Sequence, residues 1–559
     1  MMNLEPVQFI GRTLLLALMG VVSLFGSDHD ADFLVVTHDP EVEQALQISK
    51  ADMLRNRRVK NGVIGFAPGG YYNGIWMTDS TFLMSAYRYW GSGHRDFLYS
   101  DRPGALGLVP RFAAAQAPDG LIPMAIVGDE GRIEYGGRLD LAQKRKESRD
   151  MESPYMFVHV NYMYWKDTAD LTYARRYGDA MRRALQPIDH RRDAATGLIL
   201  MTYGIPNSDV CVDYAIPQTT AEPYFNALYV RAYLEYADMA EALGDAAEAK
   251  VYRAKAEALR QAVNRYSWIP ARNRYEMRIL RTPVSSDPTL PASAIKEDTR
   301  FPVVDNMLLI YYGIPDSQER VRALIHLINE TEKGLAVVGR MVVPPYPDGF
   351  ITREKLFDGG NYHNGDVWTW FSNQYAIALY RLGYPDSADH ALRSQARVAI
   401  RDKGFSEYYE DDAIGAAKGA SHYGPTAAAF QSAVVEGLFG LELDAPSHTL
   451  SVHPSLSRSG KLRVRLGGKP AEVSLDVQAQ RKEMLLRVES GLTVQGDFRV
   501  MVPEGFKAGG KWTVSRQSGG ESIPVRCSVV SLAEAAYVRF KAELGPGSET
   551  FRLSQGGTK

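Results

Sequence analysis

The feature that most constrains the fold is an alternation of long and short connections between helical segments. The helical period is clearest over 245–266, where apolar residues recur at three- and four-residue steps at Ala249, Tyr252, Ala256, Leu259 and Val263. Asp245 and Glu248 form a D-x-x-E capping box directly after Gly244. The same reading predicts helices over 40–56, 78–90, 105–117, 154–167, 171–187, 221–243, 245–265, 303–312, 317–330, 364–383, 386–402 and 424–440.

The connections between these helices differ in length in a regular way. Those after residues 90, 167, 243, 312 and 383 are short. The long ones cover 57–77, 118–153, 188–220, 266–302, 331–363 and 403–423. If successive helices run antiparallel, all long connections emerge on one face, and connections of this length are usually functional. The pattern predicts six helical hairpins in a ring, with the functional loops gathered at one end.

The pattern changes near Asp444. From there apolar and polar residues alternate over 450–453, 462–466, 473–477 and 485–488, with glycine-containing turns between the runs. A period of two is typical of antiparallel strands. The predicted fold is therefore mainly α: an (α/α)6 barrel, or six-hairpin toroid, followed by a C-terminal antiparallel β-sandwich. We assign 1–27 to a signal peptide or N-terminal anchor, 28–443 to the barrel and 444–559 to the sandwich.

The N-terminus carries an apolar segment, Thr13–Phe25, behind Arg12. It is too short to span a bilayer comfortably and has the length of a signal-peptide core. We therefore expect a periplasmic or secreted protein; the alternative is a mis-assigned start or a buried helix. Cys211 and Cys527 lie in different predicted domains, so no disulfide framework is inferred.

Composition excludes several classes of partner. The net charge is −2 and no run of Lys or Arg is long enough to bind phosphates, so we expect no nucleic acid and no membrane beyond the possible anchor. Zinc-protease, cysteine-rich metal, P-loop and serine-hydrolase motifs are missing from the sequence, so we expect no metal and no cofactor. The 31 tyrosines supply flat faces with polar tips, which suit a polar, ring-shaped ligand such as a carbohydrate. The sequence does not indicate the oligomeric state.

Two acidic segments are candidates for proton transfer. Asp213, with Asp209 four residues before it, lies in an apolar loop, where a raised pKa would let a carboxyl group hold a proton and act as a general acid. Glu407 stands between Ser406 and Tyr408, whose hydroxyl groups could hold an ionised carboxylate as a general base. The alternative for Asp209 and Asp213 is local turn hydrogen bonding.

Two further segments are candidates for substrate binding. Asp79 follows Trp76 at the start of a predicted helix, where it could cap the helix, bind sugar hydroxyls, or do both. The segment 362–370 gathers hydrogen-bonding side chains and indoles at a loop-to-helix junction, including Tyr362, His363, Asn364, Asp366 and Trp368. Such density needs a partner for every polar group, although an aromatic core would also produce it.

These segments resemble those of the six-hairpin (α/α)6-barrel glycosidases, which include debranching amylo-glucosidases, glucoamylases, family 63 α-glucosidases and α-L-rhamnosidases. Tyr362–Trp370 is similar to Y-H-N-G-T-V-W-P-W, with Asp366 and Thr369 as departures. Val212-Asp213, followed by Ala221-Glu222 and Asn226-Ala227-Leu228, is similar to W-M-D-A…V-E-I-N-A-L-W. Trp76–Asp79 resembles W-x-R-D, but Thr78 replaces the arginine. The resemblance covers about residues 40–440.

The resemblance implies a glycoside hydrolase, with Asp213 as acid and Glu407 as base. Trp76, Asp79, Asp209, Glu222 and Tyr408, with the residues of the 362–368 segment, would bind the sugar. Inversion is expected, because two loops can hold the carboxyl groups roughly 6.5–9.5 Å apart.

Three alternatives stay open. A phosphorylase on the same scaffold would use phosphate in place of water, although phosphorylases tend to carry Arg at Asn364. A polysaccharide lyase would use Asn361, Tyr362 and His363 beside a uronate. A binding protein without catalysis is the third.

Overall fold

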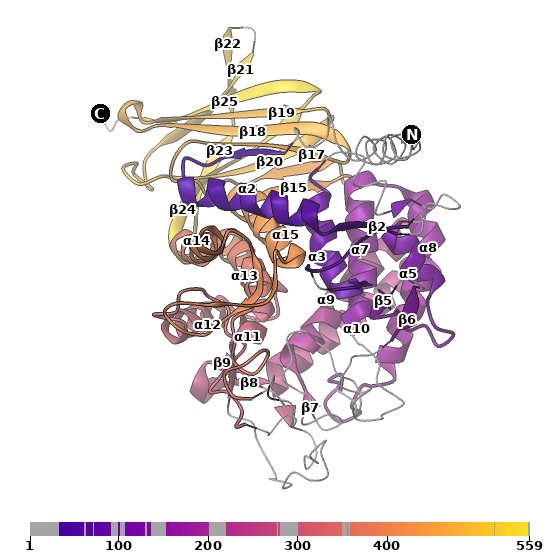
Figure 1. Cartoon of the computed structure of the whole chain (residues 1–559). Helices are drawn as coiled ribbons and strands as arrows, with labels where there is room; N and C mark the ends of the chain where they lie inside the picture. Colours follow the sequence, from indigo (N-terminus) through magenta and orange to yellow (C-terminus); the bar gives the residue numbers. More distant parts are fainter. Residues whose placement is uncertain are drawn as a thin grey trace, which may run out of the picture.

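The computed structural model describes residues 33–60, 63–70, 72–90, 99–100, 107–128, 131–135, 152–200, 220–276, 278–279, 300–348, 355, 358–518 and 520–556. Within these ranges the chain forms a helical part followed by a β domain (Figure 1). The apolar segment 13–25 lies outside them, so the signal peptide stays a prediction. No helix of the described part combines the length and the apolar character that a membrane span requires.

Six inner helices form a closed ring, seen end-on in Figure 1. Each contacts the next, and the last contacts the first. In chain order they are α3 (Met77–Tyr87), α7 (Glu152–Thr168), α9 (Pro223–Ala242), α11 (Val303–Tyr311), α13 (Thr369–Leu382) and α15 (Gly424–Ser432). The helices outside the ring are α2 (Pro40–Arg55), α5 (Leu108–Ala114), α8 (Leu171–Asp189), α10 (Ala246–Tyr266), α12 (Gln318–Thr331) and α14 (Pro385–Asp402).

The sequence explains which helices lie inside. α9 is buried on most of its surface because Pro223, Phe225, Leu228, Tyr229 and Tyr233 leave few polar positions. α10 buries a single stripe and exposes charged residues on the other side, as an amphipathic surface helix does. Its expected cap is present: the Asp245 carboxylate accepts a hydrogen bond from the Glu248 N–H at 2.9 Å.

Every predicted helix has a counterpart, with two differences of substance. The predicted helix 364–383 begins only at Thr369, because residues 358–368 form turns that carry polar side chains. The predicted helix 424–440 divides into α15 and a π-helical segment, η4 (Ala433–Leu438). Such π segments occur often at functional sites.

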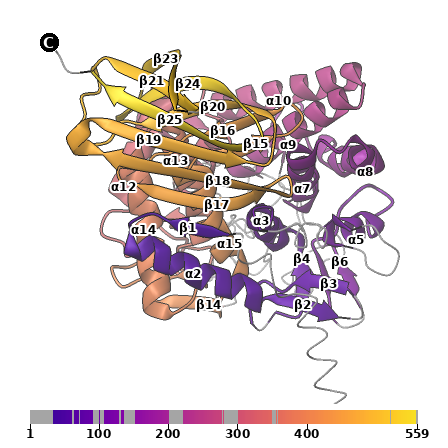
Figure 2. The ribbon, with the colours of Figure 1, turned by 90° about the horizontal axis from the view of Figure 1, so that it is seen from above.

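The β domain contains two packed sheets (Figure 2). Among the described residues one sheet has the order β1 (Leu34–Val36), β17 (Gly460–Leu466), β18 (Lys469–Gln478), β19 (Glu483–Ser490), β25 (Gly547–Gln555), β21 (Trp512–Ser518), β22 (Glu521–Val525). The other has the order β15 (Leu441–Asp444), β16 (Thr449–Val452), β20 (Val494–Met501), β24 (Ala535–Leu544), β23 (Cys527–Leu532). Phe498 and Phe540 of the second sheet pack on Phe551 of the first.

The prediction of a helical toroid followed by a β domain is confirmed. One assignment differs: residues 34–36 were placed with the helices, but β1 pairs with β17 at the edge of the larger sheet. A segment of three residues is too short for hydrophobic periodicity to identify it as a strand from the sequence.

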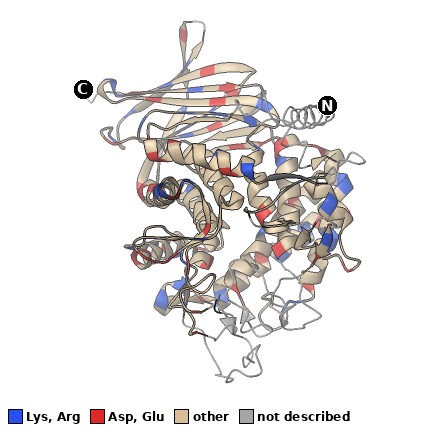
Figure 3. Cartoon of the chain, in the orientation of Figure 1, with Lys and Arg blue, Asp and Glu red and all other residues tan. Residues whose placement is uncertain are grey.

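The long connections all lead into the N-terminal ends of the inner helices, and short strands stiffen them. These strands are β2 (Arg57–Lys60) with β3 (Val63–Phe66), β4 (Gly74–Trp76) with β5 (Ala125–Val127) and β6 (Arg132–Glu134), β7 (Thr220–Ala221) with β10 (Arg278–Ile279), β8 (Trp268–Ile269) with β9 (Arg274–Tyr275), β11 (Phe301–Pro302) with β12 (Val342–Val343), and β13 (Ser406–Tyr409) with β14 (Ala417–Ser421). Figure 3 shows acidic and basic residues interspersed over the described ribbon. We call the end of the ring that these connections cover the mouth.

Candidate functional site

Buried carboxyl groups gather where the connections enter the inner helices. Asp79, Glu152 and Asp305 lie in the first turns of α3, α7 and α11, and Glu222 is the N-cap of α9. Glu407 and Asp366 lie in the segments that lead to α15 and α13. All six are buried. The positive end of a helix macrodipole favours negative charge, so the shared direction of the inner helices helps to hold these acids at the mouth.

Glu407 is held by two hydrogen-bond donors. The Tyr72 hydroxyl donates to Oε1 at 2.7 Å, and the Ala420 N–H donates to Oε2 at 2.8 Å. The residue lies in the β13–β14 hairpin at an irregularity in the register between Ser406 and Tyr408. Only 3% of its surface is exposed. These contacts fix the orientation of the carboxylate.

The hairpin approaches Glu407 so closely that residue 419 has to be glycine. Gly419 has φ +69°, and a Cβ atom there would lie 2.6 Å from Glu407 Oε2 and 2.6 Å from a ring carbon of Tyr408. Contacts under 3 Å do not occur for real Cβ atoms. Any side chain at this position would therefore displace the Glu407 carboxylate or the Tyr408 ring.

Asp79 lies next to Glu407 and shares its surroundings. The Tyr423 hydroxyl donates a hydrogen bond to Asp79 Oδ1. The pKa of Asp79 is raised to about 7, because burial and the negative charge of Glu407 together outweigh the lowering effect of the Tyr423 hydrogen bond. The N-cap of α3 is Trp76, not Asp79, and Asp79 is the third residue of the helix. The carboxyl group is therefore available to bind a ligand as acceptor or as donor near neutral pH.

Tyrosines connect these two acids with Trp76. The ring centroid of Tyr72 lies 5.2 Å from that of Trp76 and 6.3 Å from that of Tyr423. Tyr72 binds Glu407 and Tyr423 binds Asp79. The structure thus brings three predicted site residues, Trp76, Asp79 and Glu407, into one cluster.

An aromatic wall adjoins Glu407 through its neighbour Tyr408. The Tyr408 ring stacks on Trp368 at 5.2 Å, and Tyr362 meets both rings edge-on at 5.2 Å and 5.0 Å. His363 stacks on Tyr362 at 4.1 Å. Burial lowers the pKa of His363 to about 3, so its imidazole is neutral near pH 7. Within the described part of the chain neither of its ring nitrogens has a hydrogen-bond partner, which leaves both for a ligand or water.

Asn364 and Asp366 support the wall. The Asn364 side-chain amide bonds the backbone of Tyr346, accepting from its N–H at 2.7 Å and donating to its carbonyl at 3.0 Å. Asp366 accepts from the Tyr362 N–H at 2.6 Å and from Lys418 Nζ at 3.1 Å. Because Tyr362 has φ +50°, this bond stabilises an unfavourable backbone conformation. The sequence predicts both residues as sugar ligands, whereas these contacts of their side chains are to protein.

The Lys418–Asp366 pair joins the Glu407 hairpin to the aromatic wall. Lys418 lies on β14 opposite Tyr408, and burial raises the pKa of Asp366 to about 6 despite the lowering effect of Lys418. We expect Lys418→Met to lower the free energy of unfolding by about 2 kcal/mol, because it leaves a buried carboxylate without its cation. Urea unfolding of Lys418→Met, Asp366→Asn and the double variant checks this. If the loss in the double variant equals the sum of the losses in the two single variants, the pair is not coupled.

Glu222 forms a second carboxyl pair, with Asp305. The two side chains are hydrogen-bonded to each other, and the Tyr224 N–H donates to Asp305. Burial raises the pKa of Asp305 to about 8. A hydrogen bond between two carboxyl groups requires a proton, so the pair shares one near pH 7.

This pair predicts a pH dependence of stability. The folded-state pKa of Asp305 lies above its unfolded value, so its contribution is complete below about pH 4 and is lost as the pH rises through about 8. Asp305→Asn keeps a hydrogen-bond donor to Glu222 without an ionisation. We expect this variant to gain on the order of 2 kcal/mol relative to wild type between pH 5 and pH 9, measured by urea unfolding. An equal difference at both pH values would contradict the shared proton.

Asp213 and Asp209 lie outside the described residues, between Leu200 and β7. Their connection leads directly into α9, whose N-cap is Glu222. The assignment of Asp213 as acid stays a prediction.

Comparison with known proteins places this chain in a family. Residues 72–426 match the family model described as "Mannosylglycerate hydrolase MGH1-like glycoside hydrolase domain". A mannosylglycerate hydrolase of Rubrobacter radiotolerans is 28% identical over 225 residues, which is 40% of this chain and 45% of the relative. The chain thus aligns with less than half of that relative.

Solved structures share the fold at low sequence identity. An α-L-rhamnosidase from "Dictyoglumus thermophilum" has a TM-score of 0.60 at 12% identity, covering 95% of this chain and 51% of its own. A GH78 rhamnosidase from Bacillus sp. GL1 has a TM-score of 0.60 at 16% identity, covering 86% and 43%. A GH63 mannosylglycerate hydrolase from Thermus thermophilus has a TM-score of 0.50 at 17% identity, covering 69% and 99%.

The matched region begins at Tyr72 and ends at Thr426, and it contains Trp76, Asp79, the 362–368 segment and Glu407. The predicted resemblance to six-hairpin glycosidases is confirmed. The chain belongs to the mannosylglycerate hydrolase MGH1-like glycoside hydrolase family.

Proposed function

We propose that the protein is a glycoside hydrolase in which Glu407 is the general base and Asp213 the general acid, with inversion at the anomeric carbon. The arrangement around Glu407 carries the proposal. Its carboxylate is buried, fixed by Tyr72 and Ala420, and adjoins a second acid and an aromatic wall. A general base needs this kind of fixed carboxylate with lone pairs left for water.

Glu407 would remove a proton from a water molecule as that water attacks the anomeric carbon. The hydrogen bonds from the Tyr72 hydroxyl to Oε1 and from the Ala420 N–H to Oε2 would hold the carboxylate in place while it takes the proton. Asp213 would protonate the leaving oxygen from the opposite face of the ring. Inversion requires the two carboxyl groups to lie roughly 6.5–9.5 Å apart.

The neighbouring residues would bind the terminal sugar. Asp79, with a pKa of about 7, can accept from one sugar hydroxyl or donate to another. Neutral His363 offers one donor and one acceptor nitrogen, and Trp76 and the wall formed by Trp368 and Tyr408 offer aromatic surface for the C–H face of a sugar.

The family and the curated relative identify the first substrate to test. The relative is named a mannosylglycerate hydrolase, so we propose a small glycoside of this kind as substrate. Hydrolysis of mannosylglycerate and of aryl α- and β-glycosides, with the first-formed anomer followed by NMR, tests both the substrate and the inversion. Release of the anomer with retained configuration would contradict inversion.

The same assay separates the alternatives. A phosphorylase would release a sugar phosphate only when phosphate is present, and a lyase would release an unsaturated product that absorbs in the ultraviolet. The relatives are named as hydrolases and rhamnosidases, which favours neither alternative.

We also propose that the enzyme is exported, from the apolar segment 13–25. Fractionation of cells that express the full chain tests this. Protein found only in the cytoplasmic fraction would contradict it.

A further inference from the structure

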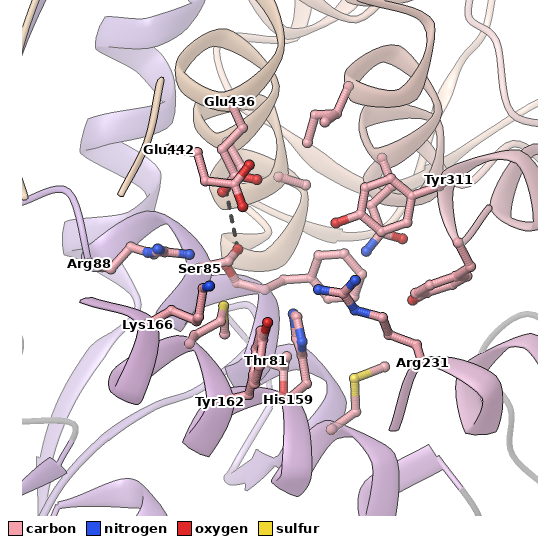
Figure 4. Close-up of a pocket in the computed structure, with 18 of the residues that line it drawn as sticks. Thr81, Ser85, Arg88, His159, Tyr162, Lys166, Arg231, Tyr311, Glu436 and Glu442 are labelled. Carbon is pink, nitrogen blue, oxygen red and sulfur yellow. Dashed lines mark hydrogen bonds between the residues drawn. The ribbon is translucent and has the colours of Figure 1, made fainter. Parts of the chain in front are cut away.

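A cavity lies toward the end of the helical ring opposite the mouth. Asp79 is near the start of α3 and Trp368 precedes α13, whereas the cavity is lined by Ser85 near the end of α3 and Arg381 near the end of α13. The other inner helices, η4 and β15 complete its lining. Its volume is about 90 Å³. Figure 4 shows side chains from several helices directed toward this space, with Glu436 and Glu442 on one side and His159 on the other.

An aromatic layer separates this cavity from the candidate catalytic site. The Phe82 ring lies 4.9 Å from Trp370 and 6.0 Å from Phe371. On its other side Trp370 contacts Tyr423, which binds Asp79. Phe82 is the residue that also lines the cavity. These rings therefore lie between the cavity lining and Asp79, and the cavity lining includes neither Asp79 nor Glu407.

The charged side chains around the cavity are paired. Arg88 binds Asp167 at 2.5 Å and Arg231 binds Glu235 at 2.6 Å. Arg381 lies 3.4 Å from Glu436 and 3.5 Å from Glu442, and Lys166 pairs with Asp444. These four cations line the cavity with Glu436 and Glu442, and Asp167, Glu235 and Asp444 pair with them from outside the lining. Because each cation already has a carboxylate partner, the attraction of a further anion to it is largely offset.

Hydrogen-bonding capacity nevertheless remains in the cavity. The side chains of Arg231 and Arg381 keep 41% and 40% of their surface accessible, although both residues belong to inner helices. Within the described chain the side chains of Tyr311 and Gln374, which also line the cavity, make no hydrogen bond. Donors and acceptors therefore face the same space from different helices.

The polar lining gives the folded protein little stability, so the needs of the fold do not explain it. Buried ion pairs stabilise a protein little or not at all relative to apolar residues of the same volume. Met163, Ile377 and Leu443 show that the same helices and β15 also place apolar side chains here. A cavity lined by paired charges and aromatic rings is suited to a ligand that both donates and accepts.

We propose that this cavity binds a small neutral polyol, of the size of glycerol or a monosaccharide. Each hydroxyl group can accept from a guanidinium and donate to a carboxylate, so the ligand adds bonds to existing ion pairs without adding charge. The rings of Tyr155, Tyr162 and Tyr312 supply apolar surface for its C–H groups. The proposal concerns a site apart from Glu407 and does not depend on the proposed hydrolase activity.

The test measures binding of D-glucose and of glycerol to the full-length protein by titration calorimetry. The variant is Tyr311→Phe with Gln374→Leu, which removes two polar groups that no described residue uses. We expect saturable binding by wild type, at least tenfold weaker binding by the variant, and the same rate of aryl glycoside hydrolysis. The matched control, Tyr266→Phe with Gln261→Leu, makes equivalent changes on outer helix α10 and should bind like wild type.

Several results would overturn the proposal. Equal binding by wild type and variant would place the sugar in the catalytic site. If glucose and glycerol only raise the unfolding temperature without limit as their concentration rises, and no saturable binding heat is measured, the effect is the general one of excluded osmolytes. Tighter binding of D-glycerate or inorganic phosphate than of glycerol would show an anion site. Crystals of the wild-type protein soaked in glucose give a check that no substitution can disturb, and unchanged density between Arg231 and Tyr311 at saturation would also refute a polyol site.

Discussion

Glu407→Gln is expected to reduce kcat by roughly 10³-fold and to lower the free energy of unfolding by about 1 kcal/mol, because the amide nitrogen would face the Ala420 N–H. The amide keeps the shape of the side chain and can still accept from the Tyr72 hydroxyl, but it cannot take a proton from water. KM should change little, because the contacts to the sugar proposed for Asp79 and the aromatic wall are untouched. Steady-state kinetics on the best aryl glycoside, together with thermal unfolding, measure both quantities.

The matched control is Glu330→Gln, the same substitution at an exposed position on α12. It should leave kcat and the unfolding temperature at wild-type values. Retention of more than a tenth of the activity by Glu407→Gln would exclude Glu407 as the base. Saturable sugar binding by the wild-type protein without any hydrolysis would leave the protein as a binding module.

Gly419→Ala is expected to lower kcat on the order of 10²-fold although residue 419 touches no substrate. Its Cβ would lie 2.6 Å from Glu407 Oε2, so the carboxylate has to move. Displacement of a catalytic group by about 1 Å can cost a factor of this size. The left-handed backbone adds about 1 kcal/mol of strain, which stability measurements separate from the kinetic effect.

Gly313→Ala provides the control for that strain. Gly313 has the same φ of +69°, but a Cβ atom there would have no neighbour within 4 Å. Gly313→Ala should lose only the stability that the backbone strain costs, whereas Gly419→Ala should lose more because of the close contacts, and only Gly419→Ala should lose activity. If the two variants have equal kcat, the close approach at Gly419 does not position Glu407.

The fold was predictable because its signals are local and repeated. The capping of α10 by Asp245 and the alternation of long and short connections depend on residues near one another in sequence. Glu407 could be singled out because Tyr408 and Tyr409 stand beside it. The start of α13 could not be predicted, because the polar residues before Thr369 are compatible with a helix end and with a loop equally.

The partners of the site residues could not be predicted. Tyr72 and Glu407 are 335 positions apart in the sequence. No spacing rule connects residues that are so far apart. Asp305 gave no signal, because it lies in an apolar run and acquires its role only through Glu222 of a neighbouring helix. Asn364 was identified as polar and near the site, but only coordinates show that its amide is used on Tyr346.

The pairing of β1 with β17 has a consequence for biosynthesis. β1 leaves the ribosome more than four hundred residues before its partner strand, and α2, which follows it, packs on α14 and α15. β1 and α2 therefore cannot pack in their final positions until β17, α14 and α15 have been synthesised. Chains with such long-range contacts fold slowly. Nascent chains stalled before residue 460 should remain sensitive to protease at Leu34–Val36, and chains released after the larger sheet is complete should resist cleavage there.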